Sequence, residues 1–398
     1  MKYQILILIF SFSSSPPDSK SNFCIFAFIN KNKSMKLKHL SVVNYKNILS
    51  CELDFSDKIN CFVGRNGMGK TNLLDAIYYL SFCKSHTNSI DSQVVAHDED
   101  FLVLQGVYDR KSLEENIYCG IKRRQKKQFK RNKVAYTKYS EHIGFLPLVL
   151  VSPADSSLIL DGSEERRRFM DIVISQYDKA YLNALIRYNV ALQNRNSLLK
   201  LEAADGLMFD LYEEEMAEAA SLIFASRNDF IQRFVPIFQY YYNTLSDGNE
   251  SVSLRYTSHL FDSQNLIDIL RSTRNRDAII GFSTKGIHKD DLEMLLGDYP
   301  IKRIGSQGQN KTYLIALKFA QFDFLKEIND GMSPILLLDD IFDKLDADRV
   351  ERIIQLVSGN RFGQIFITDT NREHLDEMLS KINYENKIFK VENGNVIF

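Results

Sequence analysis

The stretch that decides the fold reads Gly64-Arg65-Asn66-Gly67-Met68-Gly69-Lys70-Thr71. It satisfies every fixed position of the pattern G-x-x-x-x-G-K-[ST], the phosphate-binding loop (P-loop) of nucleoside triphosphatases. An apolar run over 59–63 precedes it and apolar residues at helical spacing follow it, so it lies between a predicted strand and a predicted helix. Backbone N–H groups and the positive end of the helix dipole would then face the phosphates. Lys70 is predicted to reach the β- and γ-phosphates, and the Thr71 hydroxyl to ligate Mg²⁺.

The alternative interpretation is a glycine-rich turn that binds nothing, and a second feature argues against it. The apolar strand predicted over 335–338 ends in Asp339 and Asp340, and α/β sheets bind ligands at the carboxyl ends of their strands. We expect Asp339 to hold Mg²⁺ and Asp340 to orient or deprotonate the attacking water. Alone, the acidic pair would be better explained as two solvated residues that end a strand. Together with the P-loop it predicts an ATPase.

The composition excludes several classes of protein. The chain has 398 residues, enough for two or three compact units, and its 44% hydrophobic and 25% charged content is that of an ordinary globular protein. The 50 Lys+Arg residues are balanced by 51 Asp+Glu, so any affinity for nucleic acid must be local. The five cysteines form no zinc-type cluster and are predicted to be reduced thiols. No window approaches the roughly 18 apolar residues of a membrane span, so no membrane association is expected.

Residues 1–34 differ in character from the rest of the chain. An apolar run over 5–10, followed by Ser13-Ser14-Ser15-Pro16-Pro17, has the outline of a signal peptide without a clear cleavage site. The alternative is that translation begins at Met35, where an alternating strand pattern starts. Because the nucleotide chemistry requires intracellular ATP, we predict that residues 1–34 are an extension outside the fold.

The spacing of apolar residues divides the remaining chain into three parts. Strand patterns dominate residues 35–150, and helical spacing dominates residues 151–294. Strand and helix alternate again in residues 295–398, with a helix expected from about Gln307 to Asn329. We therefore predict an α/β fold: a P-loop ATPase lobe with a mixed sheet and flanking helices, interrupted by a mainly helical second lobe.

Several motifs resemble a known family. The stretch 66–77, preceded by residues 43–47, is similar to the head domains of the chromosome-maintenance ABC ATPases, and most closely to the RecF family of bacterial recombination and replication-repair proteins. Further stretches agree with the motifs of that family: Ser152-Pro153-Ala154-Asp155, Gly162 to Asp171 with Arg166-Arg167-Arg168, Gly286-Ile287-His288-Lys289-Asp290-Asp291, the signature Ser306-Gln307-Gly308-Gln309, and Leu345-Asp346. Ile287 and Lys289 replace a proline and an arginine, and Asp343-Lys344 stands where Ser-Glu is commoner. These departures leave the reaction class unchanged.

The resemblance implies an ABC-type head with ATP and Mg²⁺ as cofactors. Ser306, Gly308 and Gln309 would meet the nucleotide of a facing protomer, so that ATP joins two copies in a C2 homodimer. The residues alone equally allow Ser306 to be a simple helix cap. The resemblance also implies a cytoplasmic, nucleoid-associated protein that binds DNA as duplex and at single-strand gap junctions. Its implied partners are recombination mediator proteins that help load recombinase.

The densest charge lies in residues 122–133, where eight of twelve residues are basic. We predict a hairpin whose cations neutralise DNA phosphates, with Phe129 and Tyr136 as candidates for stacking or sugar contacts. The alternative is a solvated hairpin, as most charge runs are. The residues expected to contact DNA are Lys122, Arg123, Arg124, Lys126, Lys127, Lys130 and Arg131. Arg166-Arg167-Arg168 could contact the DNA, the nucleotide or acids across the lobe interface, and the sequence favours none of these three partners.

Two other functions compete with a DNA-binding ATPase. The ATP-binding subunit of an ABC transporter would carry a coupling surface and a switch histidine, and would lack the basic hairpin. The last strand instead runs Ile365-Phe366-Ile367-Thr368-Asp369-Thr370, whose end we expect near the γ-phosphate. A non-hydrolysing, nucleotide-switched DNA clamp would bind ATP and DNA without turnover. Asp339 and Asp340 favour at least slow hydrolysis, and hence a weak, DNA-stimulated ATPase.

Overall fold

The computed structural model describes residues 35–201, 206–246, 248, 250–262, 265–342, 347–370, 379 and 385–397. The predicted N-terminal extension lies outside these ranges, and so do Asp343-Lys344 and Leu345-Asp346. Among the helices in the described ranges, none has the length and apolar character needed to cross a membrane.

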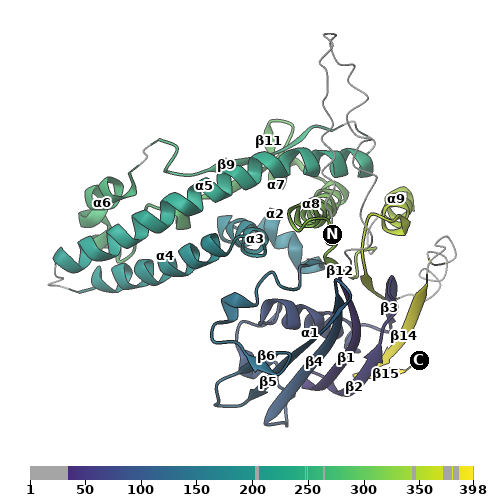
Figure 1. Cartoon of the computed structure of the whole chain (residues 1–398). Helices are drawn as coiled ribbons and strands as arrows, with labels where there is room; N and C mark the ends of the chain where they lie inside the picture. Colours follow the sequence, from purple (N-terminus) through teal and green to yellow (C-terminus); the bar gives the residue numbers. More distant parts are fainter. Residues whose placement is uncertain are drawn as a thin grey trace, which may run out of the picture. The chain divides into compact units, whose positions relative to one another are not determined.

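A six-stranded sheet in the order β15-β14-β3-β13-β12-β8 belongs to the first lobe, and β15, β14, β3 and β12 are labelled in Figure 1. All neighbouring strands are parallel except β15, which is antiparallel to β14. The strands are β3 (Ile59–Val63), β8 (Leu148–Val151), β12 (Ile335–Asp339), β13 (Ile365–Asp369), β14 (Asn386–Glu392) and β15 (Asn395–Ile397). Parallel pairing brings Val63 beside Asp369, and Thr368 beside Asp339, at one edge of the sheet. The P-loop and the acidic pair therefore meet at that edge.

A second six-stranded sheet, in the order β2-β1-β4-β5-β6-β7, is antiparallel throughout. Its strands are β1 (Met35–Tyr45), β2 (Ile48–Asp54), β4 (Phe101–Arg110), β5 (Leu113–Lys122), β6 (Gln128–Arg131) and β7 (Val134–Ala135). Helix α1 (Lys70–Phe82) lies between the two sheets and contacts strands of both. Every residue of α1 except Thr71 and Asn72 is buried, because both of its faces are covered.

Two hydrophobic cores lie on opposite faces of the parallel sheet. Along β12, Ile335 and Leu337 face the core that α1 shares with the antiparallel sheet, whereas Leu336 and Leu338 face the core of the helical lobe. This follows from the two-residue period of a strand. A strand buried on both faces reads as a continuous apolar run, which is why β12 was predictable.

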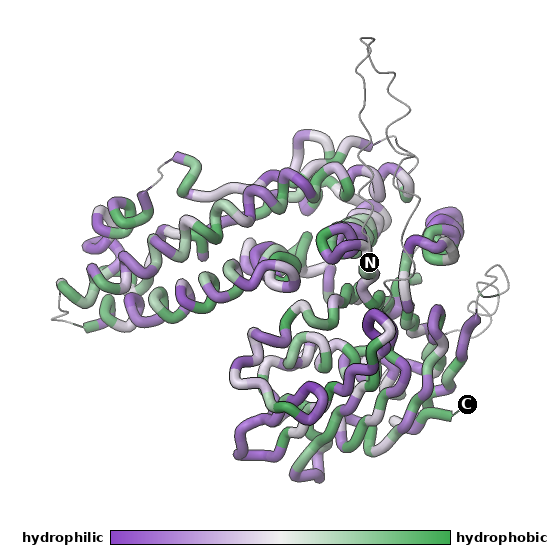
Figure 2. The backbone as a smooth tube through the Cα atoms, in the orientation of Figure 1, coloured by the Kyte–Doolittle hydropathy of each residue, from purple (hydrophilic) through white to green (hydrophobic). Residues whose placement is uncertain are grey.

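Long helices make up most of the second lobe, and a small sheet that we did not expect completes it. The helices are α3 (Ser163–Ser175), α4 (Lys179–Leu198), α5 (Gly206–Leu245) and α6 (Leu266–Ile280). Along α4 and α5, hydrophilic and hydrophobic residues alternate as in helices with one buried face (Figure 2). The sheet pairs β10 with β9 and β11. Its strands are β9 (Val252–Thr257), β10 (Asp291–Leu296) and β11 (Tyr299–Pro300).

Helix α8 (Gln307–Ile328) packs against α5 and confirms the helix expected after the signature. The other helices within the described residues are short, apart from α9. They are α2 (Ser157–Leu160), α7 (Ile301–Ile304), α9 (Ala347–Ser358) and the 3₁₀ turns η2 (Asp91–Gln93), η3 (Tyr139–Glu141), η4 (Pro153–Ser156) and η5 (Ile287–Lys289).

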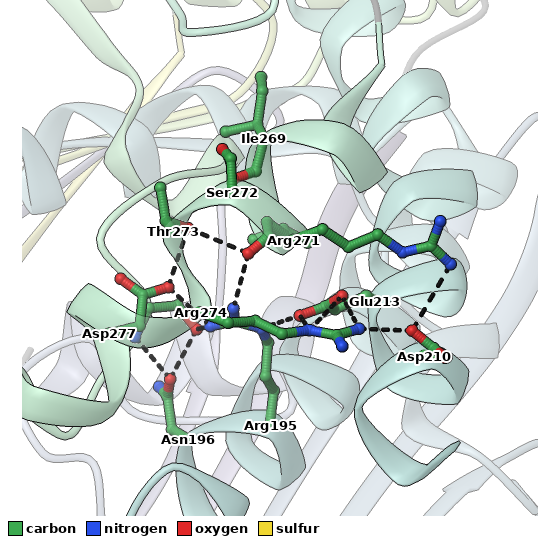
Figure 3. Close-up of polar contacts among 12 residues, drawn as sticks. Arg195, Asn196, Asp210, Glu213, Ile269, Arg271, Ser272, Thr273, Arg274 and Asp277 are labelled. Carbon is green, nitrogen blue, oxygen red and sulfur yellow. Dashed lines mark hydrogen bonds and ion pairs between the residues drawn. The ribbon is translucent and has the colours of Figure 1, made fainter. Parts of the chain in front are cut away.

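Buried charges join α4, α5 and α6 (Figure 3). Arg195 of α4 is fully buried, and its guanidinium donates to Glu213 of α5 at 3.0 Å and to Asp277 of α6 at 2.9 Å. Arg274 of α6 donates to the same Glu213 at 2.6 Å and also reaches Asp210. Charged groups at this depth are tolerated when they are paired and hydrogen-bonded. The network therefore restricts how the three helices pack.

Candidate functional site

The P-loop lies between the end of β3 and the start of α1, where the sequence predicts it. Gly67 and Gly69 have φ values of 78° and 114°, a region that favours glycine, and Gly69 is the N-cap of α1. The Lys70 ammonium donates to the carbonyl oxygens of Gly64 at 2.7 Å and Arg65 at 3.0 Å. Burial lowers the pKa of Lys70, and neighbouring acids act in the opposite direction. The loop thus places a desolvated ammonium at a helix N-terminus, as triphosphate binding requires.

Two distant turns hold the P-loop in shape. The side chain of Asn47, from the turn between β1 and β2, occupies the space that a side chain at Gly69 would need. It also accepts a hydrogen bond of 2.7 Å from the Asn72 amide. From the C-terminal hairpin of β14 and β15, the Gly394 N–H donates to the Met68 carbonyl at 2.9 Å. Asn47 stands in the stretch that carries the family resemblance, whereas the hairpin contact had no signal in the sequence.

Asp339 ends β12 and lies beside the P-loop threonine. The Thr71 hydroxyl donates to Oδ1 of Asp339 at 3.0 Å, although the two residues are 268 positions apart. The Thr368 hydroxyl donates to the same oxygen at 2.7 Å. Burial raises the pKa of Asp339, and the two threonine hydrogen bonds act against that rise. The ionised carboxylate is therefore incompletely stabilised, and a cation at this point would stabilise it.

Thr71 and Asp339 fit Mg²⁺. The ion is commonly held by one or two protein oxygens, with phosphates and waters in its other positions. Within the ranges that the structure describes, no group of three or more His, Cys, Asp or Glu side chains is arranged to hold a metal. A metal bound by Thr71 and Asp339 would therefore rely on the phosphates of a nucleotide for its remaining ligands.

Asp340 follows in a different environment from Asp339. Its φ of 49° is uncommon for a residue with a side chain, and such strain is often found at functional sites. The Asp340 N–H donates to the Thr368 hydroxyl oxygen at 3.0 Å, so Thr368 is bonded to both acids. Asp340 is half-buried, whereas Asp339 is 6% exposed. The two acids share Thr368 but differ in burial, which agrees with a separate role for each.

The signature residues form the start of α8. Ser306 is the N-cap, and its hydroxyl accepts from the Gln309 N–H at 3.2 Å while the Gln309 side chain accepts from the Ser306 N–H at 2.7 Å. A Cβ at Gly308 would lie 2.6 Å from a guanidinium nitrogen of Arg349. The helix-cap interpretation of Ser306 is thus realised in the single chain. The contact with a partner's nucleotide stays a prediction.

Two of the three consecutive arginines are held within the second lobe. Arg166 donates to both carboxylate oxygens of Asp291, at 2.6 and 3.0 Å. Arg167 donates to the backbone carbonyl of Asp290 at 2.7 Å. Both acceptors belong to the Gly286–Asp291 motif, so these arginines hold that motif against α3. The third, Arg168, is exposed.

The basic segment forms a hairpin of β5 and β6, as predicted, but three of its cations serve the fold. The Arg123 guanidinium donates to the carbonyl oxygens of Glu99 at 2.8 Å and Ser92 at 3.1 Å. Lys127 donates to the Cys83 carbonyl at 2.6 Å. The expectation that Arg123 and Lys127 face DNA therefore needs correction.

Arg131 and Phe129 also make contacts within the hairpin lobe. Arg131 donates to both carboxylate oxygens of Glu115, at 2.8 and 2.6 Å. Phe129 is 1% exposed and packs against His142, with ring centroids 4.8 Å apart, so the prediction that it stacks on DNA is wrong. The side chain of Arg131 is 40% exposed, so its contact with DNA stays a prediction. The hairpin residues that remain candidates for phosphate contacts are Lys122, Arg124, Lys126, Lys130 and Arg131.

The fold and the site define the class of protein. A P-loop and an acid-terminated strand at one edge of a mixed sheet, with a signature helix and a helical second lobe, make an ATPase head of the ABC type. The chain belongs to the RecF/RecN/SMC N-terminal domain family, whose model matches residues 36–396, and within that family to the RecF proteins.

Close relatives are curated as "DNA replication and repair protein RecF". The protein of Phocaeicola vulgatus is 62% identical over 364 residues, covering 91% of this chain and 98% of that protein. The protein of Bacteroides thetaiotaomicron is 61% identical over 362 residues, covering 90% of this chain and 98% of that protein. The resemblance that the motifs indicated is confirmed.

Solved structures agree with the fold. A structure described as the recombination mediator protein RecF with ATP, in the RecFOR pathway, matches with a TM-score of 0.82 and 30% identity over 92% of this chain and 98% of that chain. An Smc head domain from Pyrococcus furiosus matches with a TM-score of 0.53 and 18% identity over 91% of this chain and 96% of that chain, a likeness of fold. The predicted α/β head with a helical insertion is confirmed.

Proposed function

We propose that this chain is an ATP-dependent DNA-binding protein of DNA replication and recombinational repair. The names of its relatives and the ATP-bound RecF structure support this function. The observation that carries the proposal is the contact between Thr71 and Asp339, because it joins the P-loop and the acid-terminated strand in one site. We take ATP and Mg²⁺ to be the cofactors.

Each residue of the site has a role in hydrolysis. The loop N–H groups and Lys70 bind the β- and γ-phosphates. Thr71 and Asp339 would hold Mg²⁺, which when bound neutralises phosphate charge. Asp340 orients a water molecule and accepts its proton while the water oxygen bonds to the γ-phosphorus and the bond to the β–γ bridging oxygen breaks, releasing ADP. Thr368 fixes the spacing of the two acids through its hydrogen bonds.

The ATP-bound state in this proposal is a C2 homodimer. The N-terminus of α8 is accessible, since Ser306 and Gln307 are exposed. Its positive dipole end suits the γ-phosphate of ATP held by a facing protomer. In the single chain, the Ser306 and Gln309 side chains accept hydrogen bonds from N–H groups at this helix end. A phosphate from the facing protomer would replace them as the acceptor, so the cap does not exclude a contact in the dimer.

The dimer grips duplex or gapped DNA in this proposal, and hydrolysis opens it. Lys122, Arg124 and Lys126 are exposed on the hairpin and suited to phosphate contacts that carry no sequence information. Proteins of the recombination mediator class are the expected partners, and they would help load recombinase. A transporter subunit is disfavoured by membership of the RecF proteins.

Single-turnover hydrolysis with and without gapped duplex tests the catalytic part of the proposal. A non-hydrolysing clamp would bind ATP without turnover, whereas a weak ATPase would release phosphate slowly and faster with DNA. Asp340→Asn should retain ATP and stop hydrolysis, because the amide cannot accept the proton. Normal phosphate release by this variant would refute the role given to Asp340.

A further inference from the structure

The open face of the antiparallel sheet carries two accessible aromatic rings beside the basic hairpin. Phe101 begins β4 and is 44% exposed, and Tyr118 lies in β5 and is half-buried. In the register of the sheet, Phe101 is opposite Lys122 and Tyr118 is opposite Lys130. Tyr118 and Lys122 are four positions apart on one strand, so all four side chains lie on the same face.

The ring of Tyr118 leans along the sheet across a glycine. A Cβ at Gly120 would lie 2.6 Å from the Tyr118 hydroxyl oxygen and 3.1 Å from the nearest ring carbons. Because Gly120 has no side chain, the ring can approach the backbone. The Lys130 ammonium lies over this ring, 5.3 Å from its centroid, and a stacked base would take its place. Aromatic rings on an open sheet face, with cations beside them, are a platform on which nucleic acid bases stack.

The cations near these rings suit a polyanion. Lys122 and Lys126 are exposed, and with Phe101 and Tyr118 they line a shallow groove of about 190 Å³. Glu115, an acid in β5, is already paired with Arg131. The groove therefore combines apolar surface for bases with positive charge for phosphates.

The opposite end of this face offers a polyanion no comparable positive surface. There His39 contacts Glu52 at 2.6 Å and Asp54 at 2.7 Å, so its charge would be neutralised by these acids. A nucleic acid strand on this face would therefore favour the groove between β4 and β6.

We propose that this groove binds an unpaired stretch of single-stranded DNA, with bases stacked on Tyr118 and Phe101 and phosphates near Lys122, Lys126 and Lys130. The bases of a duplex are covered on both faces by their neighbours, so stacking on protein requires an unpaired base. The choice of DNA over RNA rests on the proposed function. The inference deepens that function, because the rings that would hold an unpaired strand lie beside the hairpin that would contact duplex phosphates, and a gap junction presents both.

Binding of an oligothymidine of about 15 nucleotides, a length suited to one such site, tests the proposal by fluorescence anisotropy. Tyr118→Ala should weaken binding about 5- to 150-fold, the range for loss of one stacked base. Tyr118→Phe keeps the ring and should bind like the wild type. Tyr299→Ala, which removes a 64% exposed tyrosine in β11 of the other lobe, is the matched control and should have no effect.

A spectroscopic probe checks stacking directly. The chain contains no tryptophan, so Tyr118→Trp introduces a single indole. We expect oligothymidine to quench its fluorescence, and expect no quenching of Tyr299→Trp. Absence of quenching at position 118 would overturn the proposal.

Two further measurements separate this proposal from the general one. ATP binding and ATP-dependent duplex binding should be unchanged in Tyr118→Ala, which also shows that the variant folds. An equal loss of duplex and single-strand binding would overturn the stacking site while leaving DNA binding intact. Tighter binding of an oligouridine of the same length would overturn the assignment to DNA. If the wild-type protein binds single strands but not duplex, the result would contradict the proposed function and still support the single-strand site in the groove.

Discussion

Replacing Arg195 by methionine tests whether the buried charge network holds the helical lobe together. Methionine has a similar length but leaves Glu213 and Asp277, both fully buried, without their shared partner. Arg195 also donates to the Ser283 hydroxyl at 2.6 Å, in the segment that leads to the Gly286–Asp291 motif. Removing one member of a buried ion pair costs about 3–5 kcal/mol of the free energy of unfolding.

The remaining contacts place the expected loss at the lower end of that range. Glu213 keeps Arg274, at 2.6 Å, and Asp277 keeps the Thr284 N–H at 3.1 Å and the Thr284 hydroxyl at 2.7 Å. We therefore expect Arg195→Met to lower the free energy of unfolding by about 3 kcal/mol. Arg195→Lys should give an intermediate loss, because one ammonium cannot make the forked contacts of a guanidinium.

Urea unfolding, followed together with hydrogen exchange of α4 and α6, measures this effect where it arises. Arg187→Met is the control, since Arg187 lies on the same helix but pairs with Glu215 and Glu218 on the surface. Its unfolding midpoint should be close to that of the wild type. If Arg195→Met unfolds at the same urea concentration as Arg187→Met, the network does not hold the lobe together.

Three further predictions concern the proposed site and the hairpin. Asp339→Asn should stabilise the ligand-free protein at pH values above the ordinary pKa of aspartate, because burial raises the pKa of Asp339 and disfavours its ionised form in the fold. The same variant should abolish the rise in melting temperature with Mg²⁺ and ATP, and an unchanged rise would contradict the role of Asp339. Ser306→Arg should leave ATP binding by the monomer intact and block the ATP-driven dimer, and a normal dimer by light scattering would contradict the signature contact. Changing Lys122, Arg124 and Lys126 together to alanine should flatten the slope of log duplex affinity against log salt by up to about three units, with ATP affinity unchanged. An unaltered slope would indicate that the hairpin is a solvated surface that does not contact DNA.

Local patterns were sufficient to predict the centre of the fold. The P-loop lies between a buried strand and a helix, and β12 is buried on both faces, so a few adjacent residues specify each element. The meeting of Thr71 with Asp339 followed from one rule, that parallel strands place their carboxyl ends at the same edge.

Features that depend on distant parts of the chain were not predictable in this way. Strands β9 and β10 pair across the whole of α6. Residues 252–257 of β9 do alternate between apolar and polar side chains, a local signal that was missed. The support of Met68 by Gly394 depends on the end of the chain returning to the P-loop. Phe129 and Tyr118 both lie in the hairpin, and the register of β5 with β6, rather than their residue type, decides that Phe129 points inward and Tyr118 outward.

Sedimentation velocity with ATP, in the presence and absence of gapped duplex, tests the central claim most directly. The proposed function predicts a monomer without nucleotide, a dimer with Mg²⁺ and ATP, and DNA that sediments with the dimer. Lys70→Ala should remain monomeric under all conditions, because it lacks the charge that binds the β- and γ-phosphates. A wild-type chain that stays monomeric at saturating ATP with gapped duplex present, or a Lys70→Ala chain that dimerises like the wild type, would contradict the claim.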